Sequence, residues 1–261
     1  MRHNQAILDF QRKRGDDSIA FVLPFLNATV TILDVGCGPG TITAALARAT
    51  RSAVGVDIGV KAIAAARAMA ANARLPNVGF IRGTMTALPF DAASFDAVFF
   101  HAVLYHLDAA TLAATLSEAK RVLKPGGILA TRDADSGGNI LYPETAGLLL
   151  ALDLWARWYE HADADGLRFG RRQSTILRAH GFVPTWSGAS FVNHSADERT
   201  RREAVTDATG SLRGMSADLI ARCLATREEI AQALAAWEAW SGNPDSIYLR
   251  CRCECVARKP A

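Results

Sequence analysis

The sequence predicts an α/β fold in which helices cover both faces of a parallel sheet. Short apolar runs rich in β-branched residues recur along the first half of the chain, and Ala-rich helical stretches separate them. The 261-residue chain is 50% hydrophobic and only 21% charged, which excludes a disordered protein. Alternating strands and helices give parallel sheets with right-handed crossovers, whose strands are buried on both faces.

The first elements follow this alternation closely. Residues 29–34 (TVTILD) form a β-branched run that ends in an acid, and a glycine-rich loop leads from it into a helical stretch at 41–49. Residues 52–57 (SAVGVD) predict a second short strand, and the Ala-rich segment 60–74 predicts the next helix. Residues 78–82 predict a third strand.

Two further strands complete the first half. Residues 94–101 (SFDAVFFH) are too apolar for a half-exposed strand, so we expect a buried one. An amphipathic helix is expected over 109–123 and a turn at Lys124–Gly127 (KPGG), where proline and glycine interrupt the pattern. Residues 128–132 then predict the fifth strand.

The second half of the chain is mainly helical. Residues 147–162 predict a helix that carries Trp155, Trp158 and Tyr159, and a shorter helix over 173–180 is ended by Gly181. Strands are expected within 182–192 and over 246–258, with a mostly helical region from 193 to 245 between them. Its clearest packed face joins Ile230, Ala233, Leu234 and Trp237, which follow helical spacing.

Charge and cysteine content exclude several classes of protein. The formal net charge of +3 is too small for a dedicated nucleic-acid binder. The N-terminus lacks the apolar core of a signal peptide, and the longest apolar run, 146–152, is too short to cross a bilayer. We therefore expect a soluble, cytoplasmic protein without membrane insertion. Cys251, Cys253 and Cys255 alternate as buried strand thiols would, and no zinc-type pairing exists, so no metal is expected.

The glycine-rich loop after the first strand predicts a nucleotide-type site. Gly36, Gly38 and Gly40 let the backbone turn sharply and approach a ligand, and the following helix presents backbone N–H groups. Asp57 ends the second strand, where an acid accepts hydrogen bonds from ribose hydroxyls. A nicotinamide cofactor is disfavoured, because Thr41 stands where its fingerprint requires the third glycine and Pro39 interrupts the loop.

Several motifs in this order resemble class I S-adenosylmethionine (SAM)-dependent methyltransferases, most nearly the UbiE-like, type 11 group that acts on small molecules. They are LDVGCGPG, GVD, LPFDAASFDAVFFHAVLYHL and LKPGG, all within residues 16–133, and the resemblance returns in the closing segment CECVARKP. It implies a Rossmann-like seven-stranded sheet in the order 3-2-1-4-5-7-6 whose last strand is antiparallel. It also implies SAM as cofactor, S-adenosylhomocysteine as product and no metal.

The same resemblance implies roles for individual residues in SAM binding. Asp34 and the loop from Gly36 to Gly40 would hold the methionine part, Asp57 the ribose, and Ile58 the adenine. The sequence departs from the family at Thr84, where an acid is common, which weakens the expected adenine contact of Thr84 and Met85. Two further contacts are implied for His101, near the sulfonium, and for Arg14, which would close over the cofactor.

The methyl acceptor should bind at the carboxyl ends of the strands, beside the transferable methyl group. The candidate catalytic residues are His101, Tyr105 and Asp133. Side chains after the fourth and fifth strands and in the later helical region are candidates for binding the acceptor: His106, Asp135, Tyr142, Trp158, Arg171 and Arg172. A structural alternative stays open for each, as a cap, a core residue or a solvated arginine.

The predicted organisation is one methyltransferase domain over residues 1–261. Residues 1–28 are expected to form an N-terminal helical cap. Two helical insertions, 136–180 and 193–245, are expected to act as a lid over the substrate. Such a lid would exclude water and select the acceptor. Whether the protein is a monomer or a homodimer is left open.

The predicted function is in-line transfer of the SAM methyl group to an O, N or C nucleophile of a small molecule. The alternative is an enzyme of the same fold that binds SAM but catalyses a pericyclic or lyase-type reaction. Methylation of nucleic acid is disfavoured, because the Asn/Asp-Pro-Pro-aromatic motif is absent. Arsenite methylation would need pocket thiols, whereas the three late cysteines fall on a predicted core strand.

Overall fold

The computed structural model describes residues 15–161 and 168–261, which divide into two compact units. Of these residues, unit 1 comprises 15–133, 171–188 and 253–261, and unit 2 comprises 134–161, 168–170 and 189–252. Long strands run through both units, and each unit has its own core.

Five parallel strands form the centre of unit 1. They are β1 (Thr31–Val35), β2 (Ser52–Asp57), β3 (Val78–Arg82), β4 (Phe95–His101) and β5 (Leu123–Ala134). Their spatial order is β3-β2-β1-β4-β5, so the chain starts in the middle of the sheet and reverses direction after β3. Ligands of such sheets bind outside the carboxyl ends of the strands at this reversal, which here lies between β1 and β4.

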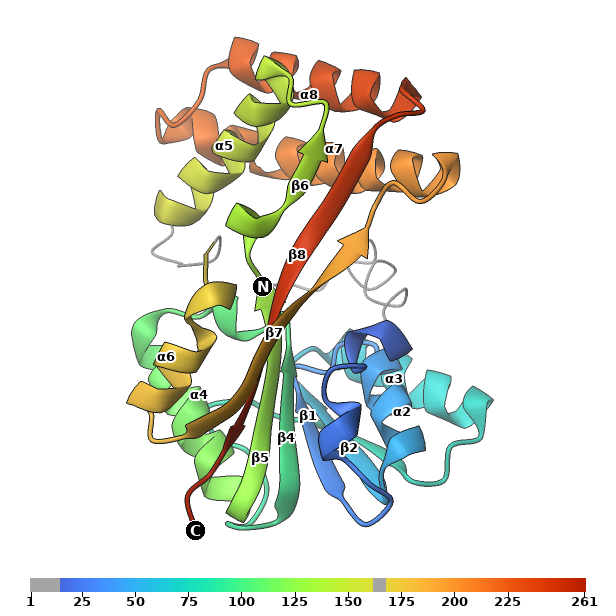
Figure 1. Cartoon of the computed structure of the whole chain (residues 1–261), viewed down its shortest axis with the longest axis vertical. Coiled ribbons are helices and arrows are strands. Elements are labelled where there is room, and N and C mark those ends of the chain that lie inside the picture. The colour runs from blue at the N-terminus through green and yellow to red at the C-terminus, as the bar shows by residue number, and fades with distance from the viewer. Residues whose placement is uncertain (1–14, 162–167) are drawn as a thin grey trace. The chain divides into compact units, whose positions relative to one another are not determined.

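Helices cover both faces of this sheet. Figure 1 shows α2 (Thr41–Ala49) and α3 (Val60–Ala73) on one side, and α4 (Ala109–Val122) and α6 (Gln173–Ala179) on the other. The core under α2 joins buried side chains of the strands, such as Ile32 and Phe99, to Leu46 and to the segment that precedes β1. The central strands β1 and β4 are buried on both faces, as their unbroken apolar sequence predicts, whereas the edge strand β3 leaves Ile81 and Arg82 exposed.

The remaining strands confirm the predicted topology and add one strand to it. β8 (Ile247–Arg258) pairs with β5, and β7 (Val183–Asn193) pairs with β8. Lys259, just after the end of β8, forms hydrogen bonds with Gly126 and Gly127, which lie early in β5. The end of β8 therefore lies beside the beginning of β5, so the last strand is antiparallel. A short strand that the sequence did not reveal, β6 (Ile140–Tyr142), also pairs antiparallel with β8. Because β6 raises the number of each later strand by one, the predicted order 3-2-1-4-5-7-6 corresponds to 3-2-1-4-5-8-7 in the observed numbering. The topology itself is the predicted one, with β6 as an additional partner of β8.

Two local predictions are corrected by the structure. The KPGG segment is not a free turn but a bulged part of β5: Leu123 pairs with Phe95, Ile128 pairs with Ala97, and the residues between them are accommodated by the bulge. Gly126 makes this possible with a φ of 73°. The cysteines of β8 are also not equivalent, since Cys251 and Cys255 are buried and Cys253 is only half-buried.

Unit 2 is a helical layer built on aromatic packing. It contains α5 (Ala146–His161), α7 (Glu198–Ala221) and α8 (Arg227–Gly242), together with β6. Trp237 and Trp240 of α8 pack edge to face, with ring centroids 5.6 Å apart, in a core that also holds Leu148 and Leu212. Thr226 and Glu229 form a capping box that fixes the start of α8.

The unit boundaries differ in part from the predicted insertions. Helix α6 was predicted within the insertion 136–180, but it groups with the sheet of unit 1. The predicted N-terminal cap, 1–28, shows two 3₁₀ turns in its described part, at Asp16–Ser18 and Leu23–Phe25. Among the helices that the structure describes, none is long and apolar enough to cross a membrane.

Candidate active site

The loop between β1 and α2 adopts backbone conformations that favour glycine. Gly36, Gly38 and Gly40 have φ angles of 78°, 53° and 85°, in the left-handed region. The backbone N–H groups of Gly36 and Cys37 donate to the carbonyl of Val56 in β2. The loop is therefore fastened to the neighbouring strand.

Close packing beneath the loop leaves no space for side chains at Gly36 and Gly40. A Cβ at Gly40 would lie 2.6 Å from Phe80 Cζ and 2.8 Å from Ala66 Cβ, and one at Gly36 would lie 2.5 Å from Val103 Cγ2. Both positions thus require glycine for backbone conformation and for space. The loop rests directly on side chains of β3 and α3 and on the segment after β4.

Asp57 connects this loop with the start of α3. Its Oδ2 accepts from the Gly38 N–H at 3.0 Å, and its Oδ1 accepts from the Gly59 N–H at 2.7 Å. The side chain is buried at the carboxyl end of β2. An ionised carboxylate only accepts hydrogen bonds, and ribose hydroxyls are suitable donors to it. The arrangement fits the predicted ribose contact.

Asp34, at the end of β1, is buried beside Asp57. Its Oδ2 accepts from the Thr43 hydroxyl at 2.6 Å, and the side chain is 2% exposed. Burial raises the pKa of Asp34 to about 7; the bond from Thr43 lowers it and the charge of Asp57 raises it. A ligand cation placed there would favour the ionised carboxylate, as the predicted contact with the SAM methionine requires.

Exposed apolar side chains lie immediately after Asp57. Ile58 is 62% exposed and Val60 60% exposed, although both are large aliphatic residues next to a buried acid. Exposed apolar groups beside buried polar ones are typical of ligand sites. Thr84 is exposed, with its hydroxyl 3.0 Å from that of Thr86, and Met85 is half-buried. These positions are consistent with the predicted adenine contacts and do not test them.

At the carboxyl end of β4, buried polar side chains from three strands, β4, β5 and β8, contact one another. The Nε2 atom of His101 lies 2.9 Å from Nη1 of Arg132 on β5, and Nε of Arg132 donates to Oε1 of Glu254 on β8 at 2.9 Å. All three side chains are buried. His101 ends β4 and contacts an arginine that the sequence analysis did not consider, and its role near the sulfonium stays a prediction.

Asp133 follows Arg132 and anchors the segment after β4. It is fully buried, and it accepts from the Val103 N–H at 3.1 Å and from the Thr131 hydroxyl at 3.0 Å. In that segment the rings of Tyr105 and His106 are in contact, with centroids 3.7 Å apart and planes tilted by 37°, and both are half-buried. Asp133 thus has an evident structural role, whereas catalytic roles for Asp133 and Tyr105 remain predictions.

The predicted acceptor residues are divided between the two units. Arg171 and Arg172 are exposed in unit 1, which also holds His106. In unit 2, Asp135 is buried, Tyr142 is 56% exposed, and Trp158 donates its indole N–H to Asp218 at 3.0 Å. Their roles in acceptor binding stay predictions. Arg14 lies outside the described residues.

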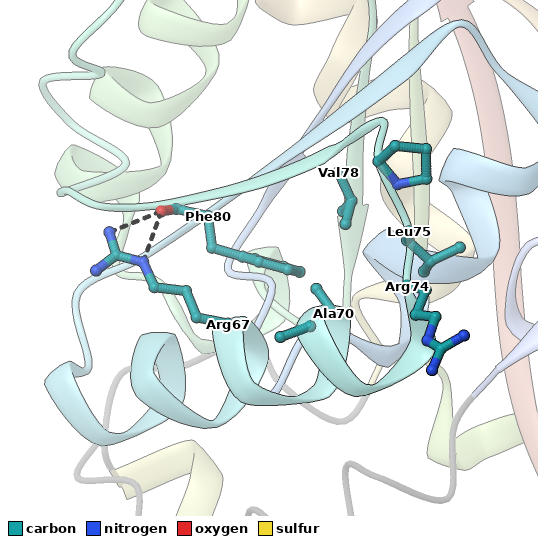
Figure 2. A pocket seen from close by; sticks show the side chains of 8 residues that line it. Arg67, Ala70, Arg74, Leu75, Val78 and Phe80 are labelled. Carbon is teal, nitrogen blue, oxygen red and sulfur yellow. Dashed lines mark hydrogen bonds between the residues drawn. The ribbon is translucent and has the colours of Figure 1, made fainter.

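A separate hollow in unit 1 is lined by α3, by β3 and by the connection between them. Figure 2 shows its lining, with Ala70, Val78 and Phe80 on its floor and the Arg67 guanidinium held by two hydrogen bonds to the Phe80 carbonyl. Its volume is about 420 Å³. Phe80 also packs under Gly40, so one ring separates this hollow from the glycine loop. None of the predicted site residues lines it.

The sequence analysis did not single out three residues that contact the predicted site residues or support them. Thr43 donates to Asp34, Arg132 contacts His101, and Glu254 accepts from Arg132. Arg132 and Glu254 left a signal, because each is a charge inside an apolar strand that must be buried. Among the described residues, no group of three or more His, Cys, Asp or Glu side chains could hold a metal ion.

Comparisons with known proteins agree with this geometry. A family model described as a methyltransferase domain matches residues 32–127, which contain the glycine loop, Asp57 and β4. A probable methyltransferase of Aspergillus luteorubrus, ltbC, is 30% identical over 282 residues, an alignment that covers 98% of this chain and 95% of the relative.

Solved structures share this fold, and one of them contains SAM. Phosphoethanolamine N-methyltransferase 2 of Haemonchus contortus, in complex with S-adenosyl-L-methionine, has a TM-score of 0.56 and 16% identity, and the match covers 94% of this chain and 53% of that one. The cyclase SpnF has a TM-score of 0.59 and 23% identity, with 96% and 85% covered. At these identities the likeness concerns the fold alone.

Proposed function

Since the chain belongs to the class I SAM-dependent methyltransferases, we propose that it transfers the SAM methyl group to a small-molecule acceptor. The observation that carries the proposal is the pair of hydrogen bonds by which Asp57 ties Gly38 of the loop to Gly59, the N-cap residue of α3. This clamp sets the loop backbone and a ribose-binding acid in one rigid arrangement. Membership of the UbiE-like subgroup stays a prediction.

The chain's own residues would hold SAM at the reversal of the sheet. Asp57 would accept from the ribose hydroxyls, Ile58 would cover the adenine, and Asp34 with the glycine loop would bind the methionine part. When bound, SAM supplies a methyl group on a sulfonium, whose leaving group is a neutral thioether. The protein's main contribution is alignment, which is worth about 7–11 kcal/mol in well-oriented intramolecular reactions.

We further propose that unit 2 governs the choice of acceptor. Support comes from its exposed side chains: Ile140, Tyr142 and Leu149 are 47%, 56% and 47% exposed and offer apolar surface with a phenolic hydroxyl. A proton acceptor is needed only for acceptors that must lose a proton, such as phenols or carbon acids. Tyr142→Ala would then change kcat/KM for the acceptor and leave SAM affinity within about twofold.

Two measurements test the proposed function. Calorimetry with SAM, S-adenosylhomocysteine and NAD should show binding of the first two and no binding of NAD. A panel of phenols, amines, quinols and carbon acids should then yield S-adenosylhomocysteine and a methylated product with at least one class. Conversion of an acceptor without consumption of SAM would overturn methyl transfer and favour the pericyclic or lyase-type alternative.

The proposal extends to the partners, the location and the assembly of the protein. We propose that the partner is a small-molecule acceptor and not a nucleic acid, and that the protein acts in the cytoplasm. Its assembly is either a monomer or a homodimer. The modest net charge of +3 is compatible with an anionic or a neutral acceptor. Light scattering at several protein concentrations would decide the assembly.

A further inference from the structure

The hollow between α3 and the edge strand β3 is separate from the proposed SAM site. It is lined by the second half of α3, by the connection that follows and by the first half of β3, whereas the SAM residues lie at the carboxyl ends of the strands (Figure 2). Its volume of about 420 Å³ falls within the range of roughly 300–1,000 Å³ that is typical of small-molecule pockets.

The floor of this hollow is apolar. Val78 and Phe80 are two positions apart on β3, so both side chains point to the face of the sheet that α3 covers. The helix contributes only a methyl group at Ala70, which leaves space between helix and strand. Ala70, Val78 and Leu75, which follows the helix, are half-buried, so part of their apolar surface is open to a ligand.

Two arginines flank the apolar floor. Arg67 and Arg74 are seven positions apart, which places them about 10 Å from each other along one side of α3. Nε and Nη2 of Arg67 donate to the carbonyl of Phe80 at 3.2 and 2.9 Å, so the guanidinium is held beside the floor. Both arginines keep their charge, and none of the eight lining residues is acidic.

The end of α3 holds Arg74 in place. Arg74 is the C-cap residue, with a φ of 51° and a ψ of 44°, and its N–H bonds to the carbonyls of Ala70 and Ala71. The N–H of Leu75 also donates to the carbonyl of Ala70, at 3.3 Å. These bonds satisfy carbonyls that would otherwise carry the negative end of the helix dipole. The electrostatic character of the hollow is therefore set by the arginines.

We propose that this hollow binds a small organic anion with a flat apolar body, of the class of aryl carboxylates. The apolar body covers Val78, Ala70 and the ring of Phe80, and the carboxylate lies at the rim, where the arginines are. A guanidinium presents a fork of donors that matches a carboxylate. A cation of the same shape is disfavoured, because no acidic lining residue offsets the two arginines.

The size of the hollow favours a small molecule over a second copy of the chain. Stable interfaces between proteins bury about 800 Å² on each partner and involve about 20–30 residues a side, whereas eight residues line this hollow. Phe80 separates the hollow from the glycine loop, since its ring packs under Gly40. The anion and SAM should therefore bind at the same time, and the proposal does not rest on methyl transfer.

Methyl NMR of the full-length protein, labelled at leucine and valine, tests binding to the hollow. The probe is naphthalene-2-carboxylate at low ionic strength, where charge interactions are least screened. The signals of Leu75 and Val78, assigned by their loss in Leu75→Met and Val78→Ile, should shift and saturate. Neutral naphthalene-2-methanol should bind at least about twofold more weakly, and 2-naphthylmethylammonium more weakly still. Shifts confined to other methyl groups, or no preference for the anion, would overturn the proposal.

Two further arms of the titration identify what occupies the hollow. With S-adenosylhomocysteine in excess the probe should stay bound, since no residue assigned to SAM lines the hollow; its displacement would contradict a separate site. If S-adenosylhomocysteine does not bind, the proposed function fails, and the probe still decides the present proposal. Shifts of Leu75 and Val78 that depend on protein concentration without the probe would mean that a second copy covers the hollow, and would overturn it.

Matched variants test the charge and the space. Arg74→Gln and Arg178→Gln each remove one exposed arginine from a helix of unit 1, and Arg178 on α6 does not line the hollow. Arg74→Gln should weaken the carboxylate about two- to fivefold, as for exposed ion pairs, and spare the neutral probe, whereas Arg178→Gln should change neither. Ala70→Phe should fill the hollow and abolish binding of both. Equal losses in the two arginine variants, or full binding by folded Ala70→Phe, would contradict the site.

Discussion

Unit 1 and unit 2 bury different kinds of side chain. In unit 1, charged or polar groups lie at the carboxyl ends of β1, β2, β4 and β5, and each is held by named partners, as Asp57 is by Gly38 and Gly59. In unit 2, the core consists mainly of aliphatic and aromatic side chains from α5, α7 and α8, and its centre is the tryptophan pair of α8.

This difference indicates which substitutions each unit should tolerate. Buried polar groups lose solvation and persist only when partners fix them, so unit 1 can place a ligand accurately and tolerates few substitutions. An apolar core accepts many sequences of similar volume. Cofactor binding in unit 1 should therefore respond to small changes, whereas changes in unit 2 should alter stability or acceptor choice and spare SAM affinity.

The largest expected effect is the pH dependence contributed by Asp34. Its pKa of about 7 in the folded protein lies above the ordinary aspartate value of 3.8, because burial disfavours the charge. The unfolded chain releases the Asp34 proton at a lower pH than the folded protein does. The contribution of protonated Asp34 to folding stability is therefore complete below pH ~4 and is lost as pH rises through ~7. Linkage gives a loss of about 4 kcal/mol.

Asp34→Asn removes this titration and serves as the reference. Urea unfolding from pH 4 to 8 should show wild type losing stability relative to Asp34→Asn across that window. Saturating SAM should reduce the loss, since a bound cation favours the carboxylate. Parallel curves for the two proteins would contradict the buried environment of Asp34, in which the Thr43 hydroxyl donates to its carboxylate.

A methyl group at Gly40 should disturb unit 1 strongly. Gly40→Ala forces a side chain into a left-handed backbone and within 2.6 Å of Phe80. We expect a stability loss of about 2–3 kcal/mol and a fall in SAM affinity of at least about tenfold. Gly79→Ala in β3 is the matched control, because an added Cβ there meets no atom within 4 Å. Equal effects of the two variants would break the account.

An equivalent insertion in unit 2 should have a different outcome. A Cβ at Gly147 of α5 would lie 2.6 Å from the Cβ of Ala236 in α8, where two helices pack. Gly147→Ala should destabilise the protein by about 1–2 kcal/mol, the overpacking cost being partly offset by better helix propensity. Calorimetry should give an unchanged SAM affinity. A tenfold weaker affinity would show that the two units are not separable in this respect.

The smallest effect is expected on the exposed face of α7. An added Cβ at Gly210 meets no atom within 4 Å, and its backbone is helical. Gly210→Ala should raise stability by about 0.5–1 kcal/mol, because glycine costs that much in a helix interior. Thermal melting checks the gain. A destabilisation would mean that this face of α7 is not open as described.

The elements of unit 1 could be predicted well from the sequence. β2, β3 and α2 have the bounds that their apolar runs and the glycine loop indicate, since local sequence determines them. Asp34, Asp57 and the loop glycines were found because a strand end and a helix start fix their place. Motif order added the antiparallel last strand.

Other features depend on contacts that are remote in sequence. Arg132 and Glu254 are 122 residues apart, and no local pattern pairs them. Phe80 lies under Gly40 because β3 and the loop meet only in the folded sheet. β6 spans three residues and forms against β8, so it has too little sequence of its own to be recognised.

The clamp formed by Asp57 is the central claim of this account. Its most direct test is calorimetric titration of SAM into wild type, Asp57→Ala and the unit 2 control Gly147→Ala. We predict that Asp57→Ala, verified as folded by circular dichroism, binds SAM at least about 100-fold more weakly, since a charged acceptor and its two loop contacts are lost. The control should bind as wild type does. Wild-type affinity in folded Asp57→Ala would contradict the assignment of this site.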